Sequence, residues 1–332
     1  MNQTYPLLSV LDLKKYFYIK KGFSEVKVLK AVDGVSFQLN PGEVLGFVGE
    51  SGCGKTTLGR TVLRLYEPTS GIIFFDGKDL CHLATSPLRR MRGRMQIIFQ
   101  DPYSSLNPRL TIGAMLQQIL RSHGIRDARM REERCIDAME KVGLEPTFQK
   151  RFPHEFSGGQ RQRIAIARAL ILYPSLIVAD EPSSALDMSI QAQILNLMKS
   201  LQQQMNIAYL FITHNLSAAR FLCDRIAVMY LGTVVELAHR AQLFDHPCHP
   251  YTKALLPLCP VPDPDSRVEQ VPLRGEVPSP VDPPEGCRFH PRCPEAKEAC
   301  SKRRPEFVEV EPGHQVACHL FAKDGCEFRV RG

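Results

Sequence analysis

The feature that most constrains this chain is the glycine-rich segment GESGCGKT at residues 49–56, which fits the pattern G-x-x-x-x-G-K-[ST]. A short apolar run, Val44–Val48, precedes it, and a stretch with helical spacing follows it. A strand, a glycine-rich loop and a helix in this order form a cradle for phosphate, because the loop N–H groups and the helix N-terminus point at the anion. The pattern therefore predicts a nucleotide phosphate site in an α/β fold.

Within this loop the residue types indicate separate tasks. Lys55 is expected to reach the β- and γ-phosphates, and the Thr56 hydroxyl is expected to ligate Mg²⁺. A glycine-rich turn that binds nothing is the alternative, but it does not account for the flanking strand and helix. The residues predicted to contact the nucleotide here are Gly49, Ser51, Gly52, Cys53, Gly54, Lys55, Thr56 and Thr57.

A second apolar strand, Ser175–Ala179, ends in two acids, Asp180 and Glu181. We expect Asp180 to hold the metal ion through water and Glu181 to polarise the water that attacks the γ-phosphate. Solvated acids are common at strand ends. The phosphate loop upstream nevertheless favours the catalytic interpretation.

Strand-like and helical segments alternate along the first 240 residues. A third apolar strand is expected at Ala208–Thr213 and a helix at Ile190–Met205, whereas residues from about 100 to 157 have helical spacing and no strand-like run. The alternation predicts an α/β core with a helical insertion between residues of about 100 and 157.

A pair of glycines lies at another predicted helix start, in the segment Ser157-Gly158-Gly159-Gln160. A serine hydroxyl beside free N–H groups forms a second anion cradle. One nucleotide needs one such cradle, so the second is expected to serve a nucleotide bound to another chain. A capped helix start is the alternative interpretation, which the position just before the carboxylate strand argues against.

Together these motifs resemble the ATP-binding subunits of ABC transporters, over about residues 8–240. The resemblance implies a RecA-like P-loop NTPase core with a β subdomain, and an ATPase that dimerises head to tail. Gln100, in the segment IIFQDP, is similar to the Q-loop glutamine that touches Mg²⁺ and the water. Asp187, in SALD, resembles the D-loop residue at the dimer interface, and His214 resembles the switch histidine at the γ-phosphate.

The resemblance also implies an aromatic side chain that stacks on adenine. Tyr16 is our prediction for it, and Phe17 is the next choice. Two positions depart from the family pattern: Phe156 stands where leucine is usual, and Asn215 stands where aspartate is usual. Neither change removes a phosphate-contacting group, so ATP hydrolysis remains the expectation.

Several stretches are similar to the oligopeptide/dipeptide importer branch of this family, namely SSLNPR at residues 104–109, HPYT at residues 249–252 and a cysteine-bearing tail. The implied partners are a second ATPase subunit, two membrane permease subunits and an extracytoplasmic solute-binding protein. The implied location is the cytoplasmic face of the membrane, with attachment through the permeases. Nickel importers share much of the pattern, so the transported solute stays open.

Four cysteines gather near the end of the chain: Cys287, Cys293, Cys300 and Cys318. A reducing compartment disfavours disulfides, so clustered thiols indicate a soft metal. A tight C-x₂₋₄-C pair typical of zinc is absent, and the looser spacing favours an iron–sulfur cluster. Related importer subunits carry a similar tail, which the resemblance associates with a 4Fe-4S cluster. Zinc, free thiols, and ligation by His319 or Cys326 are the alternatives.

The chain is expected to divide into an ABC ATP-binding domain at residues 1–240 and a metal-binding extension at residues 241–332. Prolines are dense from Pro247 to Pro284, which predicts an extended linker. The segment beyond it is too short for a core of its own, so we expect a metal to staple it.

Composition excludes several other classes. No apolar run approaches the ~20 residues of a membrane helix, and the N-terminus does not resemble a secretory signal. A net charge of +7 without a basic block predicts no nucleic-acid partner. An ABC protein without a transport role is the main alternative, but such proteins usually carry a second ATPase domain or a long coiled coil. A metal-binding regulator with an inactive ATPase is disfavoured by the complete motif set.

Overall fold

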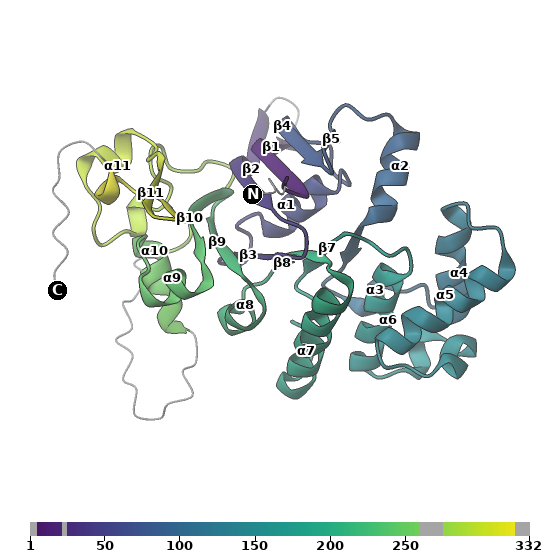
Figure 1. Cartoon of the computed structure of the whole chain (residues 1–332). Helices are drawn as coiled ribbons and strands as arrows, with labels where there is room; N and C mark the ends of the chain where they lie inside the picture. Colours follow the sequence, from purple (N-terminus) through teal and green to yellow (C-terminus); the bar gives the residue numbers. More distant parts are fainter. Residues whose placement is uncertain (1–4, 22–24, 259–274, 323–332) are drawn as a thin grey trace.

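The computed structural model describes residues 5–21, 25–258 and 275–322. Its strands form a four-stranded sheet in the order β2-β1-β4-β5 and an eight-stranded sheet in the order β11-β12-β10-β9-β3-β8-β7-β6 (Figure 1). The strands are β1 (Leu8–Lys21), β2 (Glu25–Leu39), β3 (Val44–Val48), β4 (Ser70–Phe75), β5 (Lys78–Asp79), β6 (Met95–Ile98), β7 (Leu176–Asp180), β8 (Ala208–Ile212), β9 (Arg225–Tyr230), β10 (Thr233–His239), β11 (Phe307–Glu311) and β12 (His314–Ala317).

Eleven α-helices accompany these strands within the described part of the chain. They are α1 (Lys55–Val62), α2 (Thr85–Arg94), α3 (Pro102–Ser105), α4 (Ile112–Ser122), α5 (Ala128–Lys141), α6 (Gly158–Leu170), α7 (Met188–Met205), α8 (Leu216–Leu222), α9 (Arg240–Asp245), α10 (Pro250–Leu255) and α11 (Glu298–Lys302). Short 3₁₀ turns are η1 (Pro146–Lys150), η2 (Pro153–Glu155), η3 (Leu256–Leu258), η4 (His290–Arg292) and η5 (His319–Phe321). None of the helices described here has the length and apolar character needed to span a bilayer.

The centre of the large sheet is parallel: β6, β7, β8, β3 and β9 all run in one direction. Every residue of β3, β7 and β8 is buried, as expected for strands covered on both faces. Parallel strands end at the same edge of a sheet. The loops that follow β3, β6, β7 and β8 therefore meet at one edge, where ligands bind in sheets of this kind.

Successive residues of one strand point to opposite faces, so the large sheet separates two apolar clusters. Tyr209 and Phe211 of β8 belong to the cluster that includes helices α4 to α8. Leu210 and Ile212 belong to the other cluster, which includes α1 and the four-stranded sheet. Both faces of the sheet are thus covered, which holds the strand ends rigidly in place.

Residues between β6 and β7 form a helical region that contains α3, α4, α5 and α6 and, in its described residues, no strand. Figure 1 shows α4 and α5 at one end of the molecule and α11 with β11 at the other end. This agrees with the helical insertion expected from the spacing of apolar residues.

The extended linker predicted from Pro247 onward is wrong for its first part, because α10 occupies Pro250–Leu255. Pro250 stands in the first turn, where its missing N–H costs nothing, and the His249 side chain accepts the Tyr251 N–H. The proline at residue 250 therefore marks the start of a helix and not an extended segment. Residues 259–274 of the predicted linker lie outside the described part of the chain.

The segment at residues 275–322, called the C-terminal extension below, does not form a separate core. Its strand β12 pairs with β10, so it adds two strands to the large sheet. Phe289 of the extension is buried in the same apolar cluster as β8. The extension therefore packs against the ATPase core, a source of stability that the expectation of a metal staple did not include.

Candidate functional site

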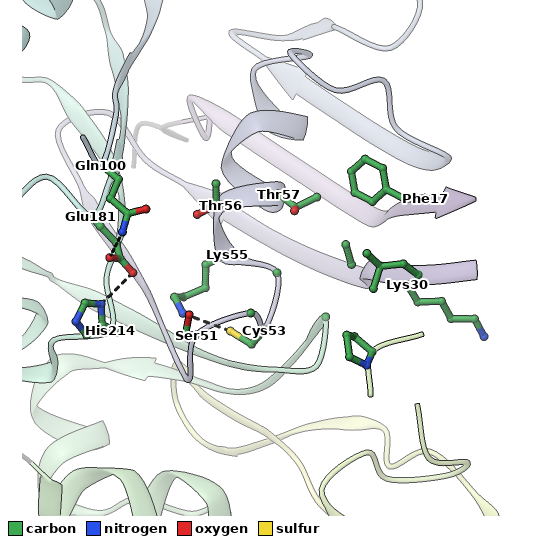
Figure 2. A pocket seen from close by; sticks show the side chains of 16 residues that line it. Phe17, Lys30, Ser51, Cys53, Lys55, Thr56, Thr57, Gln100, Glu181 and His214 are labelled. Atoms are coloured by element: carbon green, nitrogen blue, oxygen red, sulfur yellow. Dashed lines mark hydrogen bonds and ion pairs between the residues drawn. The ribbon is translucent and has the colours of Figure 1, made fainter. Parts of the chain in front are cut away.

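A cavity of about 470 Å³ opens at the edge where the parallel strands end (Figure 2). Residues 51–57 line it together with Gln100, Glu181 and His214. These groups come from four segments that are far apart in the chain, after β3, β6, β7 and β8. The predicted motifs therefore meet in one place.

The loop between β3 and α1 depends on glycine at its last turn. Gly54 has φ +105°, and a Cβ there would lie 2.0 Å from the Ala31 carbonyl oxygen. Lys55 is 5% exposed, and its Nζ donates to the carbonyl oxygens of Gly49 at 2.7 Å and Glu50 at 2.9 Å. The ammonium group is thus held inside the curl of the loop, facing the cavity.

Thr56 and Asp180 meet beside this loop, with the hydroxyl donating to Asp180 Oδ1 at 2.8 Å. Burial raises the pKa of Asp180, although the Thr56 hydrogen bond and Arg60 oppose the rise. Its second oxygen, Oδ2, is buried and has no hydrogen-bond partner among the described residues. A hydroxyl and a buried carboxylate oxygen left without a donor fit the hard ligands that Mg²⁺ prefers.

Glu181 is held between two polar side chains, as the dashed lines in Figure 2 show. Gln100 Nε2 donates to Glu181 Oε2 at 2.9 Å, and His214 Nδ1 lies 2.9 Å from Oε1. Glu181 has φ +47°, a conformation that is unusual for a residue with a side chain, and its N–H donates to the Ile212 carbonyl. A strained backbone therefore aims this carboxylate, a feature often found at functional sites.

The prediction for the adenine side requires a correction, because Phe17 lines the cavity and Tyr16 does not. The two residues are neighbours on β1, so their side chains point to opposite faces. Tyr16 donates its hydroxyl to Asp33, and burial together with this bond raises the pKa of Tyr16 to about 12. Lys30 and Pro280, which belong to none of the sequence motifs, also line the cavity.

The second glycine-rich helix start lies elsewhere. The Ser157 hydroxyl accepts from Gln160 N at 3.4 Å, and Gln160 Oε1 accepts from Ser157 N at 3.0 Å, which forms a capping box at α6. Ser157, Gly158 and Asp187 are exposed. The described residues that line the cavity do not include Ser157, Gly158, Gly159, Gln160 or Asp187.

The four cysteines of the extension, Cys287, Cys293, Cys300 and Cys318, are buried or half-buried. Burial raises the pKa of Cys287 to about 11, and the nearby Cys300 and Cys293 add to the rise. Burial also raises the pKa of Cys318 to about 12, with added contributions from Cys287, Cys293 and Cys300. Gly286 has φ +66°, and a Cβ there would lie 2.3 Å from the Cys300 carbonyl oxygen, so two cysteine-bearing segments touch closely. Among the described residues, the group of metal-binding side chains whose ligand atoms lie within 4.8 Å of one another does not include these four cysteines, so a metal or cluster here remains a proposal.

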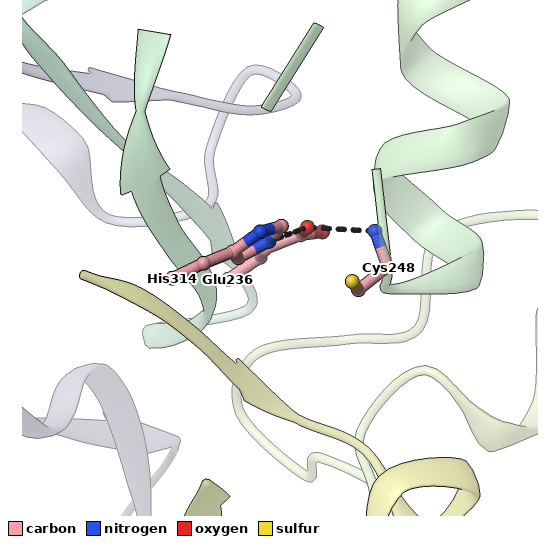
Figure 3. Close-up of side chains that lie close together, drawn as sticks. All are labelled: Glu236, Cys248 and His314. Atoms are coloured by element: carbon pink, nitrogen blue, oxygen red, sulfur yellow. Dashed lines mark hydrogen bonds and ion pairs between the residues drawn. The ribbon is translucent and has the colours of Figure 1, made fainter. Parts of the chain in front are cut away.

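A second group of metal-binding residue types, Glu236, Cys248 and His314, lies where β12 meets β10 (Figure 3). Its carboxylate is already occupied, since Glu236 accepts from Cys248 N at 2.7 Å and His249 N at 2.9 Å and pairs with His314 at 2.7 Å. Glu236 and His314 are fully buried. The group therefore fits a buried ion pair that docks the extension better than it fits a metal centre.

Contacts between the extension and the phosphate loop were not predicted. Arg292 pairs with Glu50, the second residue of the loop, and Arg288 pairs with Asp33. The signal was available in the segment CRFHPRC, where two arginines flank a phenylalanine between two cysteines. Its contact partners lie more than 200 residues away, which local patterns do not reveal.

Two family models match the chain. The model described as ABC transporter matches residues 32–184, and the model described as oligopeptide/dipeptide transporter, C-terminal region, matches residues 235–300. The chain is 53% identical over 321 residues to an oligopeptide transport ATP-binding protein, AppF, of Bacillus subtilis, covering 95% of this chain and 98% of that protein. It is 53% identical to a putative peptide import ATP-binding protein of Brucella ovis, covering 94% of this chain and 97% of that protein.

Solved structures with a similar fold cover the core. The ATP-binding cassette MJ0796, described as a dimer in a post-hydrolysis state with ADP and phosphate, gives a TM-score of 0.62 at 29% identity, covering 70% of this chain and 98% of that one. The protein cbiO1 of Clostridium perfringens, described as part of an ABC transporter complex, gives 0.63 at 25% identity, covering 73% of this chain and 91% of that one.

Proposed function

Because this chain belongs to the ABC transporter family and to its branch of oligopeptide transport ATP-binding proteins, we propose that it is the ATP-hydrolysing subunit that drives a peptide importer. The observation that carries the mechanism is the position of Glu181 between Gln100 and His214 at the mouth of the phosphate loop. A carboxylate fixed by two polar side chains is oriented to accept a proton from water that attacks a bound γ-phosphate.

The other residues of the cavity then bind and orient ATP. Lys55 contacts the β- and γ-phosphates, and the N–H groups of residues 51–57 cradle them. Thr56 and Asp180, with Gln100, would hold Mg²⁺, and the ion would supply positive charge beside the phosphate oxygens. Phe17 replaces Tyr16 as the proposed stacking partner of adenine, since its ring lines the cavity.

The site is completed by a second ATPase subunit. Ser157, the two glycines after it and Gln160 stand at an exposed helix start away from the chain's own cavity, and Asp187 is exposed as well. In a head-to-tail pair these groups would face the γ-phosphate held by the other subunit. The dimeric form of the similar cassette MJ0796 supports this arrangement.

The Glu181→Gln variant tests this mechanism. It should bind ATP with wild-type affinity, lose hydrolysis by a factor of about 10² to 10⁴, and accumulate as an ATP-bound dimer in size-exclusion chromatography. Asp79→Asn, which changes an acid away from the cavity, is the control and should hydrolyse normally. Normal turnover by Glu181→Gln would refute the role of Glu181.

The proposed assembly contains two permease subunits and an extracytoplasmic solute-binding protein, with this chain attached at the cytoplasmic face through the permeases. The similarity to peptide import proteins along 94–98% of the chain supports a peptide cargo. Co-expression with neighbouring reading frames and purification through this chain should recover two polytopic membrane proteins. Recovery of this chain alone from a membrane fraction that contains both would contradict the transport role.

We propose that the chain divides into an ATP-binding domain at residues 1–240 and a second part at residues 241–332. We also propose that the C-terminal extension binds a 4Fe-4S cluster, with zinc as the alternative. The contact between the Cys287 and Cys300 segments, where Cys287 N donates to the Cys300 carbonyl oxygen at 2.8 Å, supports a group held by thiols of both. Anaerobically purified protein should contain about four irons and absorb in the visible region, and Cys300→Ser should lose both signals. Cys81→Ser, outside the cluster, should retain them. Protein that holds neither iron nor zinc would refute the proposal.

A further inference from the structure

The C-terminal extension reaches the back of the phosphate loop through one arginine. Arg292 Nη1 donates to Glu50 Oε2 at 2.8 Å, and Nη2 donates to Glu50 Oε1 at 3.2 Å. The Arg292 side chain is 7% exposed and the Glu50 side chain is 26% exposed. A bidentate pair of this kind, largely removed from water, fixes both the position and the orientation of the carboxylate.

The arginine itself is anchored by an aromatic cluster. Phe289, three residues before it, packs with ring centroids 5.3 Å from both Tyr230 and Tyr251. Tyr251 is fully buried, and its hydroxyl accepts the N–H of Glu50 at 3.0 Å. The side chain and the backbone of Glu50 are therefore both held by groups that contact the extension.

A second connection reaches the loop at Cys53. Its carbonyl oxygen accepts the N–H of Gly232 at 2.8 Å, and the Gly232 carbonyl accepts the N–H of Asp33 at 2.8 Å. Arg288 of the extension pairs with Asp33 and donates to the carbonyl of Leu231. The phosphate loop is thus supported at both Glu50 and Cys53.

This support matters because Glu50 also holds the lysine of the loop. Lys55 Nζ donates to the Glu50 carbonyl oxygen at 2.9 Å, so a shift of Glu50 displaces the ammonium that faces the cavity. Three glycines between residues 49 and 54 leave this loop with many accessible conformations. Donors already fixed in the bound geometry bind an anion more tightly than donors that must be ordered first.

We propose that Arg292 is a positioning residue that sets the affinity for nucleotide by fixing Glu50 and, through it, Lys55. The C-terminal extension then acts as an internal brace for the phosphate loop of its own chain. This inference rests on the proposed ATP site, because it assigns a cause for nucleotide affinity at that site.

The test measures binding of a fluorescent ATP analogue to the purified full-length chain, and ATP hydrolysis by the complete transporter. Arg292→Gln should weaken nucleotide binding about tenfold and raise KM in proportion, while kcat changes less than about twofold. Arg292→Lys keeps the charge and one contact, so it should recover about half of the loss on a logarithmic scale. Lys302→Ala removes an exposed cation of the same segment that pairs with Glu298, and it should bind as the wild type does.

A double-mutant cycle separates this role from a general loss of stability. Glu50→Gln should weaken binding to a similar extent, and adding Arg292→Gln to it should cost little more, because the two residues act as one unit. Effects that simply add would overturn the proposal, as would wild-type affinity in Arg292→Gln. Failure of the wild-type chain to bind the analogue would instead refute the proposed function.

Discussion

Two glycine-rich helix starts in this protein invite comparison, because only one of them faces a cavity formed by its own chain. The start of α1 is enclosed: Lys55 is buried and the loop before it shares the cavity with Gln100, Glu181 and His214. The start of α6 is exposed at Ser157, and a capping box pairs the N–H groups of Ser157 and Gln160.

The difference shows that a helix start able to bind an anion is not by itself a complete nucleotide site. Both helices present free N–H groups and a positive dipole end, yet of the two only α1 borders the cavity that holds the side chains proposed to be catalytic. Lys55, Glu181 and His214 line the cavity at α1, whereas the described residues at the start of α6 lie outside that cavity. A pair of chains in head-to-tail contact would give each cradle what it lacks.

The largest effect is expected at the enclosed start. Lys55→Ala should lower the affinity for ATP by about a hundredfold or more, because it removes a buried cation that faces the phosphates. Equilibrium binding of a fluorescent nucleotide measures this loss. Lys30→Ala, which changes another lysine that lines the cavity, is the control and should have an effect below about threefold. Equal losses in both variants would mean that general charge, not the loop position, determines binding.

The exposed start should behave differently. Ser157→Glu places an acid where the partner's γ-phosphate is proposed to lie, so ATP-dependent dimerisation and hydrolysis should fall more than about tenfold. Nucleotide binding by the single chain should remain within about twofold of the wild type. Ser157→Thr, which preserves the cap, should retain both activities. Weaker binding to isolated Ser157→Glu chains would show that α6 acts within its own chain.

A smaller effect is expected on the adenine side of the enclosed cavity. Phe17→Ala should weaken ATP binding about five- to tenfold, near the lower end of the range of about 1–3 kcal/mol that stacking of one base on an aromatic ring contributes. Tyr16→Phe removes only a hydroxyl that contacts Asp33, so ATP affinity should not change. Titration with ATP, and with a triphosphate that lacks a base, would separate stacking from phosphate binding. Loss of ATP binding in Tyr16→Ala, with none in Phe17→Ala, would instead support Tyr16 as the stacking residue.

The smallest effect concerns stability and not the nucleotide. Burial alone would lower the pKa of His314, but hydrogen bonds to Cys248 and Glu236 outweigh it and raise the pKa from 6.5 to about 9. A histidine whose pKa is raised on folding contributes stability that is complete below about pH 6.5 and is lost as the pH rises to about 9. Glu236 has a lowered pKa, so its contribution is lost only below its ordinary value of 4.5.

The corresponding measurement compares melting temperatures of the wild type and His314→Gln between pH 5 and 9.5. The wild type should be more stable by roughly 3 °C near pH 6, and the difference should shrink above pH 8. His82→Gln changes an exposed histidine and is the control, for which we expect no comparable trend. A difference that is independent of pH would contradict the charged state of His314.

Much of the enclosed site could be predicted because its chemistry is written in short motifs. The loop before α1, the acids at the end of β7 and His214 after β8 each lie at the carboxyl end of a buried strand, and parallel strands bring these ends together. Strand β3 was predicted with the bounds that the structure has. Such predictions need only a local pattern and one rule of topology.

The errors arose where a side chain's direction or a distant partner decides the outcome. Tyr16 and Phe17 differ by one residue, and only the register of β1 against β2 and β4 determines which of them faces the cavity. Prolines near residue 250 indicated a linker, whereas Pro250 begins a helix that the sheet buries. The contact between Arg292 and Glu50 joins residues 242 positions apart, and no periodicity encodes it.

The pairing of β12 with β10 has a consequence for shortened versions of the protein. A fragment that ended after α10 would leave the outer backbone groups of Glu236 and Leu237 without the partners they have in β12. An unpaired strand edge of this kind readily recruits the same strand of another molecule, which leads to aggregation. In the full-length chain the outermost strand is instead β11, which is short and carries Glu309 and Glu311. Charges on a short outer strand discourage such recruitment, so the extension also protects the protein's solubility.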